Sequence, residues 1–237
     1  MIAAHTSFAL NGPSKELDPR INAMRGDLAD IALVGKRFAP HYAAPVEMTC
    51  VPKSATLFDK PNGQPSSELL AGEHFMLLDI SGGWAWGFSA HDHYVGYLLA
   101  DQLTPASTPI PRATSDDPVT IARSFLGQPY VWGGRGGAGI DCSGLVQRAL
   151  AGRGIAAPRD SDMQRDALGT TLDDGTPLES GDLIFFPGHV GMMIDDSQII
   201  HATRHHGKTV IEPLADVVAR VEAKNDGVGI LARKRIS

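Results

Sequence analysis

One cysteine of this 237-residue chain stands where a nucleophile would be expected. Cys142 lies in the run Asp141-Cys142-Ser143-Gly144, and the apolar residues that follow recur at helical spacing, so the cysteine opens a predicted helix over residues 142–151. Asp141 suits the N-cap of that helix. The unpaired N–H groups and the positive end of the helix dipole favour a thiolate and could face the oxyanion of an attacked carbonyl. A buried cysteine can also be inert packing, so Cys142 needs a partner to count as a nucleophile.

Two histidines offer that partner. His189 opens a strand-like run over residues 189–194, and His201 lies inside the apolar run 198–202. A turn at Asp195-Asp196 folds the two runs into a hairpin and brings the histidines towards the same end. A neutral His189 could take the proton of Cys142 and return it to a leaving amine, while His201 orients its ring. The plainer interpretation is a surface histidine at a strand start and a hydrogen-bonded histidine in the core.

The same residues belong to a longer series of motifs. The series reads Pro129-Tyr130-Val131-Trp132-Gly133-Gly134, Asp141-Cys142-Ser143-Gly144, Pro158-Arg159-Asp160-Ser161, Gly181-Asp182-Leu183-Ile184-Phe185-Phe186, Gly188-His189-Val190-Gly191 and Ile200-His201-Ala202. In order and spacing it resembles the NlpC-type cell-wall cysteine peptidases. The resemblance implies a papain-like α+β domain of helices plus antiparallel sheet, with Cys142 as nucleophile, His189 as base and His201 as the polar orienting residue.

The resemblance also implies a substrate-binding set. It places Tyr130, Asp141, Ser143 and Ser161 around the amino end of the substrate. The Tyr130 hydroxyl could donate to the oxyanion or to substrate, or the ring could pack beside the glycine-rich loop. The charge of Asp141 would face a free ammonium group, although as a plain N-cap Asp141 would contribute only about 1 kcal/mol.

Residues 45–104 have a different character. Short strand-like runs alternate there with glycine-containing turns, which predicts a small all-β barrel of five or six strands. This segment resembles bacterial SH3-like domains. Its pairing with the catalytic motifs resembles γ-D-glutamyl-L-diamino acid endopeptidases, and the resemblance implies that the barrel supplies acidic and tyrosine contacts to substrate. The candidates are Glu47, Glu73, Tyr94 and Tyr97.

Four segments are therefore predicted: an N-terminal arm over residues 1–44, the SH3-like barrel over 45–104, a proline-rich linker over 105–118 and the peptidase domain over 119–237. Within the arm, Ile21, Met24, Leu28 and Ile31 recur at helical spacing, which favours one helix between residues 18 and 34.

Composition narrows the function further. A formal net charge of −6 argues against nucleic acid or an anionic membrane as the main partner, and no stretch approaches the roughly 20 apolar residues of a membrane span. Residues 1–10 lack the basic and apolar regions of a secretory signal, so we expect a cytoplasmic protein. A zinc site from Cys142, His189 and His201 is chemically possible, but no Cys-x-x-Cys accompanies them. We expect no metal and no cofactor, and the oligomeric state is left open.

The sequence thus predicts a hydrolase of murein peptides. Cys142 and His189 would cleave the γ-D-glutamyl-diamino acid bond of peptides with a free N-terminal L-Ala through a thioester. Two alternatives remain open at this point. The first is an amidase or acyltransferase on the same fold. The second is a non-catalytic wall-binding protein.

Overall fold

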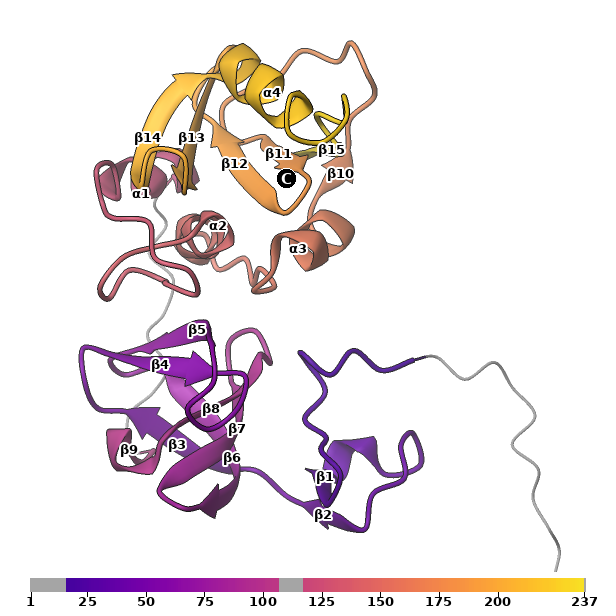
Figure 1. Ribbon diagram of the computed structural model, residues 1–237, viewed down its shortest axis with the longest axis vertical. Helices are drawn as coiled ribbons and strands as arrows, with labels where there is room; N and C mark the ends of the chain where they lie inside the picture. The colour runs from indigo at the N-terminus through magenta and orange to yellow at the C-terminus, as the bar shows by residue number, and fades with distance from the viewer. Residues whose placement is uncertain (1–15, 107–116, 237) are drawn as a thin grey trace, which may run out of the picture.

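The computed structural model describes residues 16–106 and 117–236 of the chain. Three parts follow one another: an N-terminal segment, an all-β domain and a larger domain of helices and sheet (Figure 1). Residues 1–15 of the predicted arm and residues 107–116 of the predicted linker lie outside the described residues. No helix within the described ranges is long and apolar enough to cross a membrane.

The N-terminal segment is not the helix that its spacing predicted. It contains β1 (Leu28–Asp30), which pairs in parallel with β2 (His41–Ala43), and a 3-10 turn, η1 (Ile31–Leu33), capped by Asp30. Tertiary contacts override the spacing: Ala23 packs with Trp86 and Phe88 of the β domain, which an extended segment can reach. The prediction of one helix across residues 18–34 was therefore wrong.

The β domain is one antiparallel sheet of seven strands in the order β5-β4-β8-β7-β6-β3-β9. Its buried centre includes Leu57, Leu69, Phe75 and Leu98. Asn62, with a positive φ, helps to close the β4–β5 hairpin that the Pro61-Asn62-Gly63 run marks. The strands are β3 (Val46–Cys50), β4 (Ser54–Phe58), β5 (Pro65–Leu70), β6 (His74–Ser81), β7 (Trp84–Ser89), β8 (Val95–Leu99) and β9 (Leu103–Pro105), with a 3-10 turn η2 (Ala100–Gln102).

The larger domain has helices first and a sheet afterwards, which confirms the predicted α+β fold. Six strands follow the order β10-β15-β11-β12-β13-β14. The helices are α1 (Pro118–Ser124), α2 (Cys142–Ala151), α3 (Ser161–Ala167) and α4 (Leu214–Glu222). The strands are β10 (Thr170–Thr171), β11 (Leu183–Phe186), β12 (His189–Met193), β13 (Gln198–Thr203), β14 (Lys208–Pro213) and β15 (Ala232–Arg235).

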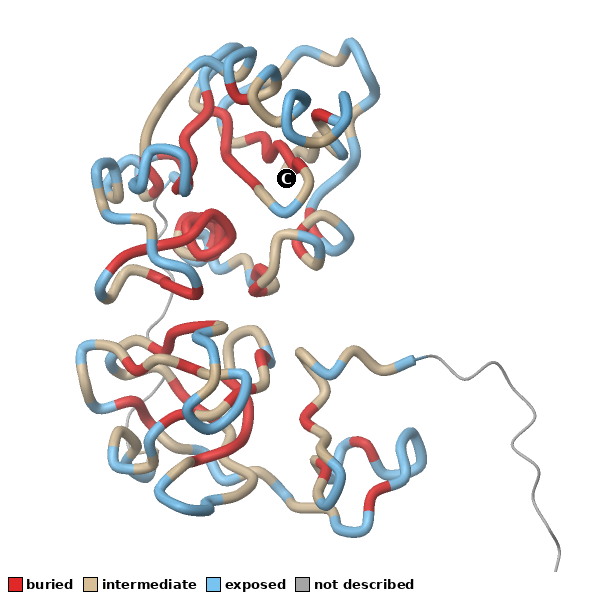
Figure 2. Tube along the Cα trace, in the orientation of Figure 1, coloured by how far each residue is buried: buried red, intermediate tan, exposed pale blue. Residues whose placement is uncertain are grey.

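Helices cover both faces of this sheet, so its central strands are buried throughout (Figure 2). Alternate residues of β11 show the two faces: Leu183 and Phe185 join the core that contains α2, whereas Ile184 and Phe186 join the core that contains Val217 of α4. The helix α2 is buried along most of its length and packs on β12 and β13. This packing fixes the start of α2 against the start of β12.

A buried ionic network joins the β domain to the larger domain. Arg135, only 3 % exposed, donates from its guanidinium to Glu73 at 2.6 and 3.1 Å, and its backbone N–H donates to Glu68 at 2.7 Å. The glycine-rich loop can approach this closely because Gly137 lacks a side chain: a Cβ there would overlap Glu68 Oε1 and the Ser54 hydroxyl, well inside contact distance. The two domains therefore meet through fully paired buried charges.

Candidate active site

Cys142 is the first residue of α2, as predicted, and its side chain is buried. Asp141 caps the helix by accepting from the Gly144 N–H at 2.7 Å. The backbone N–H groups of Val190 and Ser143 are hydrogen-bonded to the Cys142 sulfur. The thiol therefore lies beside the start of β12, one residue from His189.

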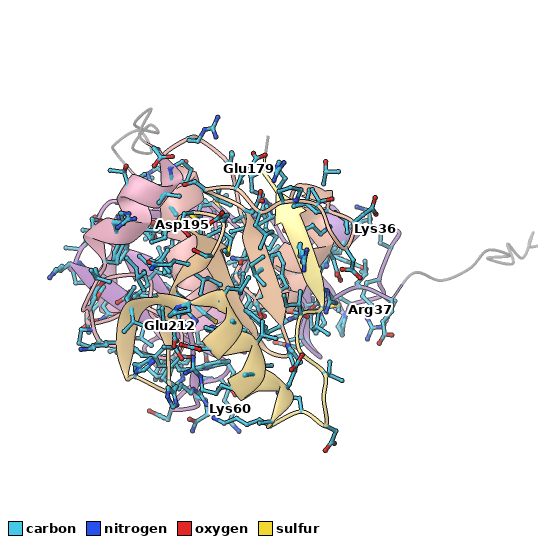
Figure 3. The ribbon with its side chains drawn as sticks, turned by 90° about the horizontal axis from the view of Figure 1, so that it is seen from above. Lys36, Arg37, Lys60, Glu179, Asp195 and Glu212 are labelled. Atoms are coloured by element: carbon cyan, nitrogen blue, oxygen red, sulfur yellow. The ribbon has the colours of Figure 1, made fainter. Side chains whose placement is uncertain are left out.

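The two histidines form a hydrogen-bonded chain with an acidic residue. His189 Nε2 lies 2.7 Å from His201 Nδ1, and His201 Nε2 lies 2.7 Å from Glu212 Oε1. Glu212 comes from β14, next to α4, where Arg220 donates to the same oxygen at 2.5 Å (Figure 3). The structure thus brings the predicted pair together and adds Glu212 and Arg220 behind it.

This chain fixes where the protons are. Burial opposes ionisation of Glu212, but hydrogen bonds from Arg220 and His201 outweigh it and lower the pKa of the carboxyl group. A carboxylate only accepts, so His201 carries its proton on Nε2 and accepts at Nδ1. His189 must then donate from Nε2, which leaves Nδ1 as the nitrogen with the lone pair. His189 is therefore held in the tautomer that a general base requires.

The resting pair is neutral. Burial, followed by the charge of Asp141, raises the pKa of Cys142 to about 12, although the Val190 and Ser143 N–H groups lower it. Burial, the adjacent His201 ring and the positive charge of Arg220 lower the pKa of His189 to about 3. The N–H group of Ser143 at the start of α2 favours the thiolate, as expected, but desolvation of the sulfur outweighs this effect. A thiol and a neutral imidazole await the substrate.

Asp141 is less available than the sequence implied. Arg159, 1 % exposed, donates to Asp141 Oδ1 at 3.0 Å and to Oδ2 at 2.5 Å, and Gly133 N–H donates to Oδ2 at 2.8 Å. Arg159 also donates to the Ser143 hydroxyl at 2.8 Å and to the Ser67 hydroxyl of β5 at 3.0 Å. The Asp141 carboxylate is thus already paired, and we assign its charge to the structure rather than to an ammonium group.

A cavity of about 330 Å³ opens in front of Cys142. Asp141, Ser143 and Ser161 line it, as predicted, and the β domain contributes Ser66 and Tyr94. Of the four barrel candidates, only Tyr94 is part of this lining. The other three have different partners: Glu47 contacts His74, Glu73 pairs with Arg135, and Tyr97 packs on Trp86.

Asp160, at the N-cap position of α3, is the carboxylate that this cavity presents. It accepts from the Tyr94 hydroxyl at 3.1 and 3.3 Å and from Arg20 at 2.8 Å. Burial raises its pKa despite the nearby Arg20 and Arg159, so a further cation would favour its charged form. Asp162 of α3, exposed at the rim, also binds Arg20, at 3.0 Å. The lining here thus combines these carboxylates with two arginines, Arg20 and Arg165.

Tyr130 lies on the other side of the thiol. Burial and the proximity of Cys142 and Asp141 raise its pKa to about 12, so its hydroxyl keeps the proton that it could donate. Arg204 stacks over the Tyr130 ring, with 5.7 Å between the guanidinium carbon and the ring centroid. Tyr130 lines a cavity with His189 and His201, not the cavity that Asp141, Ser143 and Ser161 line, so the structure divides the predicted binding set.

Sequence reasoning missed Glu212, Arg159, Asp160 and Arg20. Arg159 and Asp160 lie inside a quoted motif, Pro158-Arg159-Asp160-Ser161, and an arginine between apolar segments could have signalled a buried partner. Glu212 lies in an alternating strand with nothing to distinguish it from a solvated carboxylate. Arg20 lies 140 positions from its partner, and no local pattern indicates such a contact.

Comparison with known proteins identifies both domains. Residues 127–221 match the NlpC/P60 family, and residues 57–103 match the bacterial dipeptidyl-peptidase SH3 domain. The chain is 39 % identical over 113 residues to a γ-D-glutamyl-L-lysine dipeptidyl-peptidase of Bacillus cereus, covering 44 % of this chain and 33 % of that one. It is 27 % identical over 173 residues to the protein of the same name from Bacillus subtilis, covering 68 % and 54 %.

The chain is also similar to a solved structure. An NlpC/P60 family protein of Bacillus cereus is 27 % identical, with a TM-score of 0.45 over 81 % of this chain and 63 % of that one. The chain spans about a third to a half of the length of the two curated Bacillus relatives. Residues 127–221 are therefore an NlpC/P60 domain and residues 57–103 a bacterial SH3 domain, which confirms both resemblances.

Proposed function

We propose that this protein is a cysteine peptidase that hydrolyses the γ-D-glutamyl-diamino acid bond of murein peptides with a free N-terminal L-Ala. The observation that carries the proposal is the hydrogen-bonded chain from Glu212 through His201 to His189, placed beside a thiol in an open cavity. The curated relatives named for γ-D-glutamyl-L-lysine cleavage support the choice of bond.

The proposed reaction begins from the neutral pair. Cys142 sulfur attacks the carbonyl carbon while its proton passes to His189 Nδ1. The carbonyl electron pair moves onto oxygen, where the N–H groups at the start of α2 and the Tyr130 hydroxyl can donate. The oxyanion collapses, the C–N bond breaks, and His189 gives its proton to the leaving amine, which leaves a thioester. Water then attacks, with His189 as base, and the second collapse releases the acid and restores the thiol.

The Asp160 end of the first cavity supports a free amino end. Asp160, joined to Tyr94 of the β domain, offers a carboxylate to an ammonium group in the cavity that Cys142 also lines. Muramic acid on that amine would remove its charge and add bulk, so Asp160, whose pKa is raised by burial, would lose the further cation that favours its charged form. This assigns to Asp160 the role that the sequence gave to Asp141.

A requirement for a free amine favours peptides already released from the wall. We therefore propose that the enzyme works in murein recycling in the cytoplasm. Fractionation of the native host with an antibody tests the placement, and recovery of most of the protein outside the cytoplasm would contradict it without touching the chemistry.

Incubation of the full chain with L-Ala-γ-D-Glu linked to diaminopimelate or to lysine, followed by mass analysis, tests the reaction. Release of L-Ala-γ-D-Glu and the free diamino acid is expected. A transferred acyl group or cleavage at another amide would favour the acyltransferase or amidase alternative. Binding without turnover, unchanged in Cys142→Ala, would favour a wall-binding protein.

A further inference from the structure

A second cavity, of about 260 Å³, lies on the other side of Trp132 and Gly188, two residues that line both cavities. His189 and His201 line this second cavity, whereas Cys142 lines the first. His189 must deliver a proton to the leaving amine, so the leaving residue has to lie on the side where His189 is. The second cavity therefore fits the diamino acid, if the proposed reaction is correct.

Three basic side chains line this second cavity: Arg204, Arg220 and Lys224. Arg204, at the end of β13, holds its guanidinium carbon 4.8 Å from the ring centroid of Trp132, which is 54 % exposed. Lys224 follows α4 and is exposed. Stacking and exposure leave the donors of these two side chains available to a ligand.

No carboxylate is among the described residues that line this cavity, and Glu212, which pairs with Arg220, is already shared. Glu212 accepts from Arg220 at 2.5 Å and from His201 at 2.7 Å, and its second oxygen lies 3.4 Å from His206. The negative charge of Glu212 is thus already paired with Arg220 and hydrogen-bonded to His201. The second cavity keeps an excess of positive charge.

The excess of positive charge affects the pKa of a neighbouring histidine, His205. Partial desolvation and the charges of Arg220, His206 and Lys224 lower the pKa of His205, and the opposing effect of Glu212 does not offset them. Arg220 also contributes to the lowered pKa of His189. The positive field thus extends from the rim of the second cavity to the reacting atoms.

We propose that the second cavity binds the leaving diamino acid and selects one whose side chain ends in a carboxylate beside its ammonium group, as in diaminopimelate, over lysine. The inference rests on the proposed function and deepens it. Arg204 and Lys224 can donate to that carboxylate, which an arginine fork and an ammonium group both suit. Lysine would bring only a cation into a site that already holds an excess of them.

The test uses the full chain and three tripeptides that share L-Ala-γ-D-Glu. Their third residues are meso-diaminopimelate, L-lysine and meso-diaminopimelate with its side-chain carboxyl amidated. We expect kcat/KM for the first to exceed that for each of the others by roughly ten-fold. Amidation removes only the carboxylate charge, so this substrate pair tests the cavity without any mutation.

Variants then locate the preference. Arg204→Gln and Lys224→Gln should each reduce the ratio of kcat/KM between diaminopimelate and lysine peptides. Lys36→Gln is the control. It removes a lysine charge from the N-terminal segment, which lies on the opposite side of Figure 3 from Glu212, and should leave this ratio unchanged. Circular dichroism confirms that each variant is folded.

Each outcome decides a different claim. Equal kcat/KM for the diaminopimelate and lysine peptides, in an active enzyme, would overturn the inference and leave the proposed function intact. A preference that survives in both variants would overturn the assignment to this cavity. No cleavage of any of the three peptides would overturn the proposed function itself.

Discussion

The two cavities beside Cys142 and His189 differ in their charged groups. The first combines two carboxylates, Asp160 and Asp162, with two arginines, Arg20 and Arg165, whereas the second presents Arg204 and Lys224 around an exposed tryptophan. A short murein peptide has a matching polarity, with an ammonium group at its amino end and carboxylates at its diamino acid. Opposed charges at the two ends would fix the direction in which the peptide lies across Cys142.

The cavities also differ in how they are assembled. The first needs all three parts of the chain, because Arg20, Tyr94 and Asp160 come from the N-terminal segment, the β domain and the larger domain. The basic side chains of the second all come from residues 204–224. In the proposed binding mode, tertiary contacts therefore bind the amino end of the substrate, and one stretch of sequence binds the leaving residue. Substitutions far from the site should therefore disturb the first cavity more than the second.

Loss of the Cys142 thiol should have the largest effect on turnover, because in the proposed reaction a substrate bound in both cavities is attacked by this one sulfur. Cys142→Ala should lower kcat by at least about 10⁴-fold, and His189→Ala should nearly match it, since the two act as a unit. Calorimetry should still detect binding of the tripeptide to Cys142→Ala. Cys50→Ala, in the β domain, is the control and should keep near-normal turnover. Normal turnover by Cys142→Ala would refute the mechanism.

Asp141 and Asp160 line the same cavity, but substitution of Asp141 should lower stability whereas substitution of Asp160 should raise KM. Asp141→Asn leaves Arg159 buried without its charge partner, so the free energy of unfolding should fall by about 3–5 kcal/mol. Urea denaturation measures this, and Asp162→Asn, at an exposed carboxylate, should stay within about 0.5 kcal/mol of the parent. If Asp141→Asn instead kept its stability and raised KM alone, Asp141 would be the ammonium partner after all.

Asp160→Asn should act on substrate. It removes the charge that faces the free amine while Asn still accepts from Tyr94, so KM for the free tripeptide should rise roughly 10- to 100-fold. The N-acetylated tripeptide, which has no ammonium group, should show no further rise. Measuring both peptides on both proteins gives the coupling directly. Equal losses on the two peptides would mean that Asp160 does not bind the amine.

Glu212→Gln should have a smaller effect, confined to the proton path. A glutamine can donate as well as accept, so it no longer fixes the tautomer of His201 or, through it, the lone pair on His189 Nδ1. We expect kcat to fall roughly ten-fold with KM nearly unchanged. Asp195→Asn, at the exposed β12–β13 turn, is the matched control (Figure 3). A change in KM alone would place Glu212 in substrate binding.

The pH dependence of kcat should be the smallest of these effects, and comparing it with the pH dependence of KM separates the role of His189 from that of Asp160. His189 has its pKa lowered to about 3, so it stays a neutral base and kcat should change less than two-fold or so between pH 7 and pH 5. An ordinary histidine would be only about 3 % neutral at pH 5. KM for the free tripeptide should rise first, because burial raises the pKa of Asp160.

The same depressed pKa affects the fold, and its sign is clear. The unfolded chain binds a proton at His189 near pH 6.5 and the folded chain near 3, so the stability contribution is complete above pH 6.5 and declines as pH falls towards 3. Circular dichroism at each pH keeps unfolding apart from the rate. A fall in kcat centred near pH 6.5, with the fold intact, would show that His189 titrates normally.

Local spacing predicted the positions of Cys142, His189 and His201 in the fold well. Cys142 at a helix start and two histidines on neighbouring strands follow from short-range patterns, and the antiparallel sheet followed from the strand-like runs. The periodicity of Ile21, Met24 and Leu28 misled, because packing of Ala23 on Trp86 decides that segment. Periodicity records which faces are apolar, but it does not say which partner will cover them.

The rest of the site depends on pairings that no spacing records. The sequence could mark Asp141 as charged and near the nucleophile, but only the fold shows that Arg159, 18 positions on, has already neutralised it. Glu212 acquires its role by lying opposite Ile199 on β13, next to His201 in the ladder. The role of a buried charged residue depends on its partners, so residue type and spacing alone do not predict that role.

Arg159 joins the cap of the catalytic helix to a hydroxyl of the β domain, and Arg135 makes a second such tie beside it. The SH3 domain is consequently a poor candidate for exchange or removal in engineering. An isolated peptidase domain would carry two guanidinium groups cut off from Ser67, Glu68 and Glu73, and a transplanted barrel would need to restore those groups in register. Heating the intact chain should then melt both domains in a single transition.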